Sequence, residues 1–194
     1  DGDDLTFSIS GGSDITASLS GSDVSFNAPA NYNGSETFSV SVSDGELTDS
    51  QSITIIVNAV NDAPTLAAVG DRSMDEDGSL NFLLSGFDIE GDLLIYSVTS
   101  GTNITSALVG NDLTFTPDQD FNGSESFTVS VSDGELTDSQ SITVTVNAVN
   151  DAPTLASVGD RSMDEDGSLN FLLSASDIEG DLLTFSISSG INIT

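Results

Sequence analysis

The segment NDAPTLA at residues 61–67 occurs again, unchanged, at residues 150–156. The two copies are offset by 89 residues. The match extends without a gap over residues 61–105 and 150–194, in which 37 of 45 positions are identical. A fixed long period is typical of tandem repeat proteins, in which each repeat is one structural unit. The chain of 194 residues therefore contains about two repeats' worth of sequence.

The repeat has the alternation of polar and apolar residues that is typical of β-strands, and it lacks helical periodicity. Phe127, Val129 and Val131 alternate with Thr and Ser, and Ile142 and Val144 do the same. Clusters of Gly, Asp, Asn and Ser separate these runs and indicate turns. Short strands joined by polar turns predict an all-β protein built from β-sandwiches.

Two prolines indicate where the repeats begin. Pro64 and Pro153 each follow a predicted strand that ends in Val-Asn-Ala-Val, and proline cannot continue the strand ladder. We therefore expect the C-terminal part of one repeat at 1–60, a complete repeat at 61–149 and the N-terminal part of a third at 150–194. The two partial repeats are expected to expose core faces and to pair head to tail between chains.

The composition excludes several classes of function. The chain has 32 acidic and two basic residues, Arg72 and Arg161, and a formal net charge of −30. Nucleic acids and anionic membranes are poor partners for such a chain, because both require clustered Lys and Arg. Cysteine and histidine are absent, so disulfides, thiolate metal sites and the usual nucleophile–base pairs cannot form. We expect a protein that is not an enzyme, is not inserted in a membrane, and takes up cations or works in high salt.

The acids gather in turns and between repeats. Carboxylate and carbonyl oxygens are the ligands of Ca²⁺, which takes six to eight of them. Two acids separated by one residue in an extended loop can turn towards the same ion. Pairs with this spacing include Asp88 and Glu90, Asp118 and Asp120, and Asp133 and Glu135. The alternative is that these acids only solvate the turns.

Four motifs together resemble the cadherin-like repeats of very large bacterial surface proteins, such as RTX-type adhesins. They are Val-Asn-Asp-Ala-Pro at 60–64 and 149–153, Asp-Ile-Glu-Gly-Asp-Leu-Leu at 88–94 and 177–183, Asp-Phe-Asn-Gly-Ser-Glu-Ser-Phe at 120–127, and Val-Ser-Asp-Gly-Glu-Leu at 131–136. The resemblance implies tandem seven-stranded Ig-like (cadherin-like) sandwiches, one complete and two partial. It also implies Ca²⁺ between consecutive domains.

The resemblance assigns metal ligands on both sides of each linker. Each linker would supply an Asn-Asp pair, the following domain an Asp-x-Glu pair and a further Asp, and the preceding domain a Glu and a second acidic pair. For the first linker the implied ligands are Asn61, Asp62, Asp88, Glu90 and Asp133. For the second linker they are Glu76, Asp118, Asp120, Asn150, Asp151, Asp177 and Glu179.

The sequence departs from this pattern at the first linker. Pro29 and Asn31 stand where the complete repeat has Asp118 and Asp120. We therefore expect the first linker to bind Ca²⁺ more weakly than the second. Both linkers lack the extra acid that precedes the Asn-Asp pair in longer cadherin linkers, since Ala59 and Val60, and Ala148 and Val149, occupy that place, so the number of ions per linker stays open.

Taken together, the sequence predicts calcium-rigidified extender repeats of a bacterial cell-surface adhesin, acting outside the cell in adhesion or biofilm formation. The expected partners are Ca²⁺, neighbouring repeats of the same protein, and a glycan or another adhesin. The alternative is a carbohydrate-binding or homophilic adhesion module. Sugars usually stack on exposed aromatic rings, and the chain has no Trp and only Tyr32 and Tyr96, which weakens the carbohydrate hypothesis.

Overall fold

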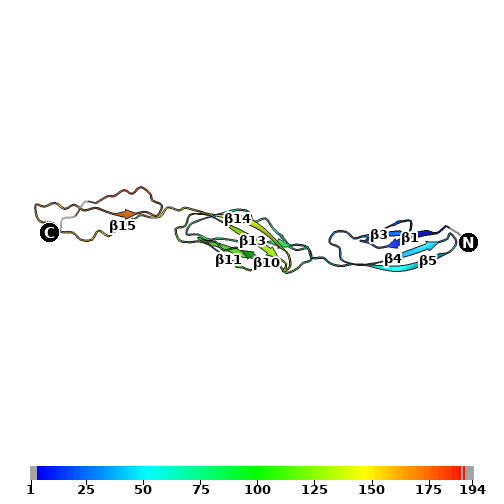
Figure 1. Cartoon of the computed structure of the whole chain (residues 1–194). Coiled ribbons are helices and arrows are strands. Elements are labelled where there is room, and N and C mark those ends of the chain that lie inside the picture. Colours follow the sequence, from blue (N-terminus) through cyan, green and yellow to red (C-terminus); the bar gives the residue numbers. More distant parts are fainter. Residues whose placement is uncertain (1–3, 189, 191–194) are drawn as a thin grey trace. The chain divides into compact units, whose positions relative to one another are not determined.

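The structure is a computed structural model that describes residues 4–188 and residue 190. Within this part of the chain the regular elements are strands, and no helix is long and apolar enough to cross a membrane. The chain divides into two compact units. The first contains the residues up to Ala63 together with Asp88–Asp92, and the second contains Pro64–Phe87 and the residues from Leu93 onward (Figure 1).

The first unit contains two small sheets. One has the strand order β1-β4-β5, and the other is the antiparallel pair β2-β3. Phe38 on β4 packs edge to face against Phe26 on β3, with ring centroids 4.9 Å apart, so side chains of the two sheets meet. The strands are β1 (Thr6–Gly11), β2 (Thr16–Ser20), β3 (Asp23–Asn27), β4 (Gly34–Ser43) and β5 (Thr48–Val57).

The second unit contains the repeat predicted at 61–149, except residues 61–63 and 88–92, which belong to the first unit. It has a four-stranded sheet of order β10-β13-β14-β7 and a three-stranded sheet of order β11-β12-β8. A short pair, β6-β9, completes it. The neighbours are antiparallel except β7, which runs parallel to β14. The strands are β6 (Thr65–Leu66), β7 (Arg72–Asp75), β8 (Leu80–Leu83), β9 (Gly86–Phe87), β10 (Ile95–Val98), β11 (Ile104–Val109), β12 (Asp112–Pro117), β13 (Gly123–Ser132) and β14 (Thr137–Asn147).

The core of the complete repeat follows from the two-residue period. Phe127 on β13 and Ile142 on β14 pair in register, and both are buried. From the opposite sheet Phe115 meets Phe127, with ring centroids 4.6 Å apart. Successive side chains of a strand point to opposite faces, so the apolar set of each strand reaches one shared core. The predicted all-β sandwich fold is confirmed.

The segment after Val149 forms few strands. The alternation in its sequence predicts the early strands of a further repeat, but its described residues form only the pair β15 (Thr154–Leu155) and β16 (Ala175–Ser176). The reason lies in the pairing of the complete repeat, where β7 pairs with β14 and β8 pairs with β12. The segment contains no counterparts of β12 and β14. Its last positions, 189 and 191–194, lie outside the described residues.

Candidate metal centre

Glu76 lies directly after β7, where the chain turns at Asp77 and Gly78. The backbone N–H of Glu76 donates to Asn147 O at the end of β14 (3.0 Å), and its Oε1 accepts from Val149 N (2.5 Å). These bonds fix the carboxylate at the point where the chain leaves the complete repeat. The side chain is only 2% exposed, yet Oε2 has no hydrogen-bond partner within the described residues.

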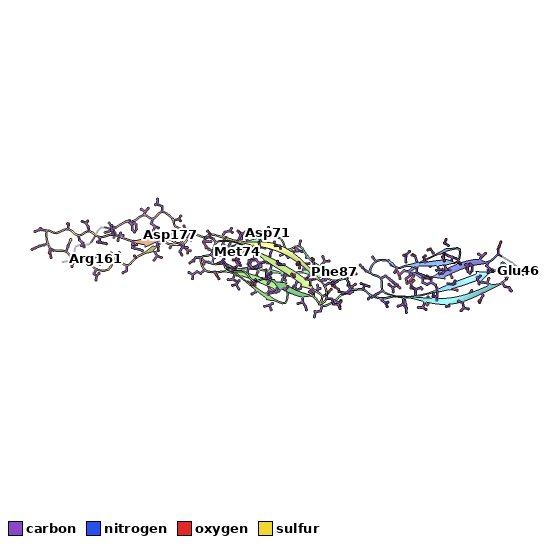
Figure 2. All side chains as sticks on the ribbon, in the orientation of Figure 1. Glu46, Asp71, Met74, Phe87, Arg161 and Asp177 are labelled. Carbon is purple, nitrogen blue, oxygen red and sulfur yellow. The ribbon has the colours of Figure 1, made fainter. Side chains whose placement is uncertain are left out.

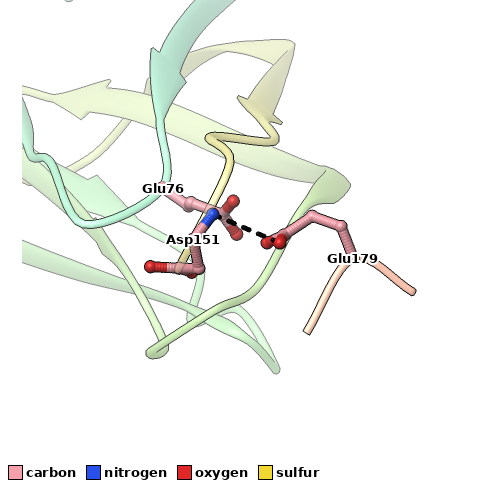
Figure 3. Close-up of side chains that lie close together, drawn as sticks. All are labelled: Glu76, Asp151 and Glu179. Carbon is pink, nitrogen blue, oxygen red and sulfur yellow. Dashed lines mark hydrogen bonds between the residues drawn. The ribbon is translucent and has the colours of Figure 1, made fainter. Parts of the chain in front are cut away.

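Two further carboxylates from the next segment join Glu76. Asp151 follows the second Asn-Asp pair, and its backbone N–H donates to Glu179 Oε2 at 3.2 Å (Figure 3). Glu76, Asp151 and Glu179 each offer one carboxylate oxygen, and these oxygens lie within 4.8 Å of one another. Asp151 Oδ2 and Glu179 Oε1 also lack a partner among the described residues, so each of the three residues has one unpartnered buried oxygen.

The charges around Asp151 are all negative. Burial raises the pKa of Asp151 above its ordinary value, and the neighbouring charges of Glu179, Asp120, Asp77 and Glu76 raise it further. Burying carboxylates together without a counter-charge is costly. The two bases of the chain do not supply one here, since the guanidinium of Arg72 lies 5.1 Å from the Phe82 ring centre and that of Arg161 lies 5.3 Å from the Phe171 ring centre. The arrangement is suited to a hard cation that prefers oxygen ligands.

Other predicted ligands of the second linker lie in different settings. Asp120 has a positive φ of 56° and is close enough to contribute to the pKa of Asp151, while Gln119 Nε2 donates to its Oδ2 (3.2 Å). Asp118 is exposed, and its charge is not among those that raise the pKa of Asp151. Asn150 uses its side-chain amide to donate to Asp151 O (3.0 Å).

Asp177 completes the set of predicted ligands at the second linker (Figure 2). Its Oδ1 accepts from Asp181 N at 3.0 Å and so holds the loop that presents Glu179. The structure therefore brings Glu76, Asp151 and Glu179 into one cluster, with Asp120 nearby, and gives Asp177 a supporting contact in the same loop.

The first linker repeats part of this geometry within the first unit. Asp62 N donates to Glu90 Oε2 at 3.4 Å, the counterpart of the bond between Asp151 and Glu179. Asp88 is 6% exposed, its Oδ1 accepts from Glu90 N (3.0 Å) and Asp92 N (3.1 Å), and its Oδ2 is unpartnered among the described residues. Asn61, the remaining predicted linker ligand, is half-buried.

A hollow of about 260 Å³ lies beside the first Asn-Asp pair. Asp62 and Glu90 line it together with Pro29, Asn31 and Tyr32. At the first site, Pro29 and Asn31 thus occupy the positions that Asp118 and Asp120 occupy in the complete repeat. Within the described part of the chain, the only group of three clustered acids is the one at the second linker.

Asp133 closes the hairpin between β13 and β14. Its Oδ1 accepts from Glu135 N and Leu136 N, both at 2.7 Å. Asp44 makes the same contacts in the first unit, and the backbone N–H of Leu47, followed by that of Glu46, lowers its pKa. The sequence offered Asp133 as a ligand, and the structure shows a role in the turn that the spacing alone did not reveal.

Glu125 is a further acid whose role the sequence did not indicate. It lies on β13, and its carboxylate accepts from the backbone N–H groups of Thr102 (3.0 Å), Asn103 (2.7 Å) and Ile104 (3.3 Å) and from Asn103 Nδ2 (2.9 Å). Burial raises its pKa, but these donors outweigh burial and the net pKa is lowered. Glu36 makes equivalent backbone contacts with residues 13–15 in the first unit. The signal was available in the Ser-Glu-Ser and Ser-Glu-Thr segments that recur at the start of this strand.

The fold and the site define a class of protein, namely tandem Ig-like, cadherin-like sandwiches with a carboxylate cluster beside a repeat junction. The chain belongs to the bacterial Ig domain family, whose sequence model matches residues 1–56 and 61–145, more than half of the chain. No curated protein matches the chain.

Solved structures support the same fold. Extracellular cadherin domains 1–4 of protocadherin gamma B7 align with a TM-score of 0.50 and 14% identity, over 89% of this chain and 50% of that one. PcdhgB3 EC1-4 aligns with a TM-score of 0.52 and 16% identity, over 90% and 50%. The endo-fucoidan hydrolase MfFcnA4 is 25% identical over 76% of this chain and 24% of that one. Its TM-score is only 0.39, and no conclusion is based on this similarity. The chain spans half or less of these proteins, and the likeness concerns the fold alone.

Proposed function

We propose that the chain is a calcium-binding extender segment of a bacterial cell-surface adhesin, acting outside the cell. The observation that carries this proposal is the set of unpartnered buried oxygens on Glu76, Asp151 and Glu179, which lie where one repeat passes into the next. Buried polar groups are nearly always satisfied, and a bound cation would satisfy all three at once. Membership of the bacterial Ig domain family agrees with a repeat of this kind.

The chemistry also explains why a cation would stiffen the junction. Glu76 belongs to the complete repeat, whereas Asp151 and Glu179 belong to the segment that follows it. Without metal, the three carboxylates repel one another and favour separation. An ion that binds all three joins the two parts and adds its binding free energy to the stability of the joined state. The residues available for this role are Glu76, Asp120, Asp151, Asp177 and Glu179 at the second junction and Asn61, Asp62, Asp88 and Glu90 at the first.

The direct test is a Ca²⁺ titration of the full chain. Isothermal calorimetry, thermal unfolding and small-angle X-ray scattering monitor the titration, and the protein in chelator is the reference. We expect calcium to raise Tm and to narrow the distribution of the radius of gyration. If saturating Ca²⁺ changes neither quantity relative to the chelator, the proposed function is wrong. Mg²⁺ at the same concentration serves as the control for general screening of the −30 charge.

Paired variants test the assignment of sites. Asp151→Ala combined with Asp177→Ala should reduce calcium uptake at the second junction more than Asp62→Ala reduces it at the first. The reason is that the clustered carboxylates of the second junction include Asp151, while Asp62 faces a hollow bordered by Pro29 and Asn31. Equal losses in calorimetry would contradict the proposed ranking of the two sites.

No observation favours the carbohydrate alternative. Tyr32 and Tyr96 are both half-buried, and Tyr96 packs against the core of the complete repeat. Neither ring forms an open platform on which a sugar could stack. Homophilic adhesion, biofilm formation and the ligand of the parent adhesin stay predictions of the sequence, to be tested by binding between chains immobilised on separate surfaces.

A further inference from the structure

The complete repeat contains a long segment without any charge. Residues 93–111 include neither an acid nor a base, and this is the longest such stretch in a chain that has 32 acids. Asp92 and Asp112 border it on either side. The equivalent stretch of the first unit, residues 4–22, carries Asp4 and Asp14 where the complete repeat has Leu93 and Asn103. The lack of charge is therefore particular to the complete repeat.

The uncharged segment forms one open side of the sandwich. It contains β10, an edge of the four-stranded sheet, and β11, an edge of the three-stranded sheet (Figure 1). Edge strands present unpaired N–H and C=O groups, and proteins usually protect them with charges, prolines or bulges. Residues 93–111 contain no charge and no proline. The backbone of β10 is thus open to pairing with a further strand.

A hollow of about 470 Å³ lies between these two edges. Leu94, Tyr96 and Leu108 are half-buried side chains at the margin of the core, and they form its apolar part. On the outer face of β10, Leu93 is 81% exposed and Ile95 is 58% exposed. The core of the repeat therefore continues into an apolar hollow that is open to solvent. The full lining is Leu94, Ile95, Tyr96, Leu108, Gly110 and Asn111.

The exposed isoleucine beside the hollow is also particular to this repeat. Thr6 and Thr184 stand at the positions of the other two repeats that correspond to Ile95. Threonine suits a β-strand as well as isoleucine does, so the strand itself does not require the larger apolar side chain. An isoleucine at an exposed edge supplies apolar contact area for a neighbour that lies beside β10.

The charges around the open side are acidic. Ile95 pairs with Ser132 on β13, which places the hairpin with Asp133 and Glu135 next to the start of β10. Asp112 follows directly after the last residue of the hollow. β7, which carries one of the two bases of the chain, is the opposite edge of the same sheet. Charge complementarity therefore favours a partner with positive charge at its ends.

We propose that the side between β10 and β11 binds an extended peptide with apolar residues at alternate positions and Lys or Arg at its ends. The peptide adds a strand to the edge of β10 through backbone hydrogen bonds. Since successive side chains of a strand point to opposite faces, every second residue enters the hollow over Leu94, Tyr96 and Leu108, and the others lie beside Ile95. A second copy of the chain is a poorer occupant, because its charge of −30 repels the acids at this side.

The first experiment uses a synthetic peptide as the probe. The capped peptide Lys-Val-Thr-Val-Thr-Val-Lys is as long as residues 93–99 and has the proposed pattern. Its binding to the full chain is measured by calorimetry in chelator and at about 0.15 M salt, where exposed charges are screened beyond about 8 Å. We expect one peptide per chain, and slower hydrogen exchange in β10 but not in β7.

Three analogues of the peptide test its charge and its mode of pairing. An analogue with Glu in place of both Lys should not bind. Two further analogues carry N-methyl groups, one on the three Val residues and the other on the two Thr residues. A strand exposes alternate N–H groups on its two edges, so added-strand pairing predicts that one of these analogues binds and the other does not.

Matched variants of the protein test the surface. Ile95→Thr introduces the residue that the other two repeats have at this position, so the variant should fold, and it should weaken peptide binding by about three- to tenfold. Leu83→Thr is the control, because Leu83 is 68% exposed on β8, at the far edge of the three-stranded sheet. This variant should bind the peptide like the wild type.

Several outcomes would overturn the proposal. The basic peptide could fail to bind, or the acidic analogue could bind equally well. If both N-methylated analogues and both protein variants bind alike, the peptide is held only by general attraction to an acidic chain. If light scattering shows a dimer that Ile95→Thr dissociates, the occupant is a second copy. Because all measurements are made in chelator, their failure leaves the calcium proposal standing, and a chain without calcium sites could still bind the peptide.

Discussion

Replacing Glu76 with Gln should stabilise the protein without calcium and weaken its response to calcium. The carboxylate is 2% exposed, and one of its oxygens has no partner among the described residues. An unsatisfied buried polar group costs about 1–3 kcal/mol, and more when it is charged. Gln keeps an acceptor for Val149 N and removes the charge, and its amide can donate to Asp151 or Glu179. We therefore expect the free energy of unfolding in chelator to rise by about 1–3 kcal/mol.

Calcium should stabilise Glu76→Gln less than it stabilises the wild type. A gain of 1 kcal/mol corresponds to about 4–8 °C in Tm for a domain of this size. Ligand at about 100 times its Kd stabilises by about 2.7 kcal/mol, and a tenfold loss of affinity removes about 1.4 kcal/mol of this. Thermal unfolding by calorimetry should thus show Glu76→Gln above the wild type in chelator, with a smaller calcium-induced increase in Tm.

Glu125→Gln is the matched control, since Glu125 is another glutamate of the same repeat whose two carboxylate oxygens both have partners. This variant should be less stable than the wild type in chelator and in calcium alike, with an unchanged calcium-induced shift. The reasoning about Glu76 is refuted if Glu76→Gln lowers Tm in chelator, or if it retains the full calcium response.

Three other variants test separate parts of the structure. Asn31→Asp should raise the calcium affinity of the first junction in calorimetry, because Asn31 and Asp120 share a positive φ (59° and 56°) and the new carboxylate would enter the same backbone geometry. The backbone N–H of Asp14, with help from Ser13 and Ile15, lowers the pKa of Glu36 to about 2, below its ordinary 4.5. The stability from this group is present above about 4.5 and is lost as the pH falls towards 2, so Glu36→Gln should flatten acid unfolding of the first unit in that window. In urea, Ile142→Ala should cost about 2–5 kcal/mol, because the side chain of Ile142 is 1% exposed.

The sequence predicted those features that depend on nearby residues. The Asp-Glu-Asp-Gly segment forms the same turn in both copies, with φ of 63° at Asp77 and 58° at Asp166. In each copy the glycine N–H donates to the carbonyl of the first Asp, at 3.2 Å for Gly78 and 3.1 Å for Gly167. The strand before the turn differs, because β7 forms only in the copy that has β14 beside it. Turns follow from local chemistry, whereas strands require partners far along the chain.

The candidate site was predictable to a similar extent. Duplication and resemblance pointed to Glu76, Asp151 and Glu179, which the structure brings together although Glu76 and Glu179 are far apart in sequence. The spacing of acids did not distinguish these carboxylates from Asp133, which bonds to the backbone of its own hairpin. That distinction depends on whether N–H groups face the carboxylate, and this becomes visible only once the chain is folded.

The acids of this chain therefore fall into two populations with different needs. Glu125 and Asp133 accept hydrogen bonds from backbone N–H groups inside a repeat. Glu76, Asp151 and Glu179 keep unpartnered oxygens, and they lie where one repeat passes into the next. A protein whose carboxylates all served solubility would leave these oxygens in water. Among the described residues, the unpartnered buried side-chain oxygens belong to these three acids and to Asp88, a predicted ligand of the first linker. Calcium removal should therefore loosen the connection between repeats while the strands of the complete repeat keep their protection from hydrogen exchange. Equal loss of protection in β13 and at the junction would show that the two populations are not separate.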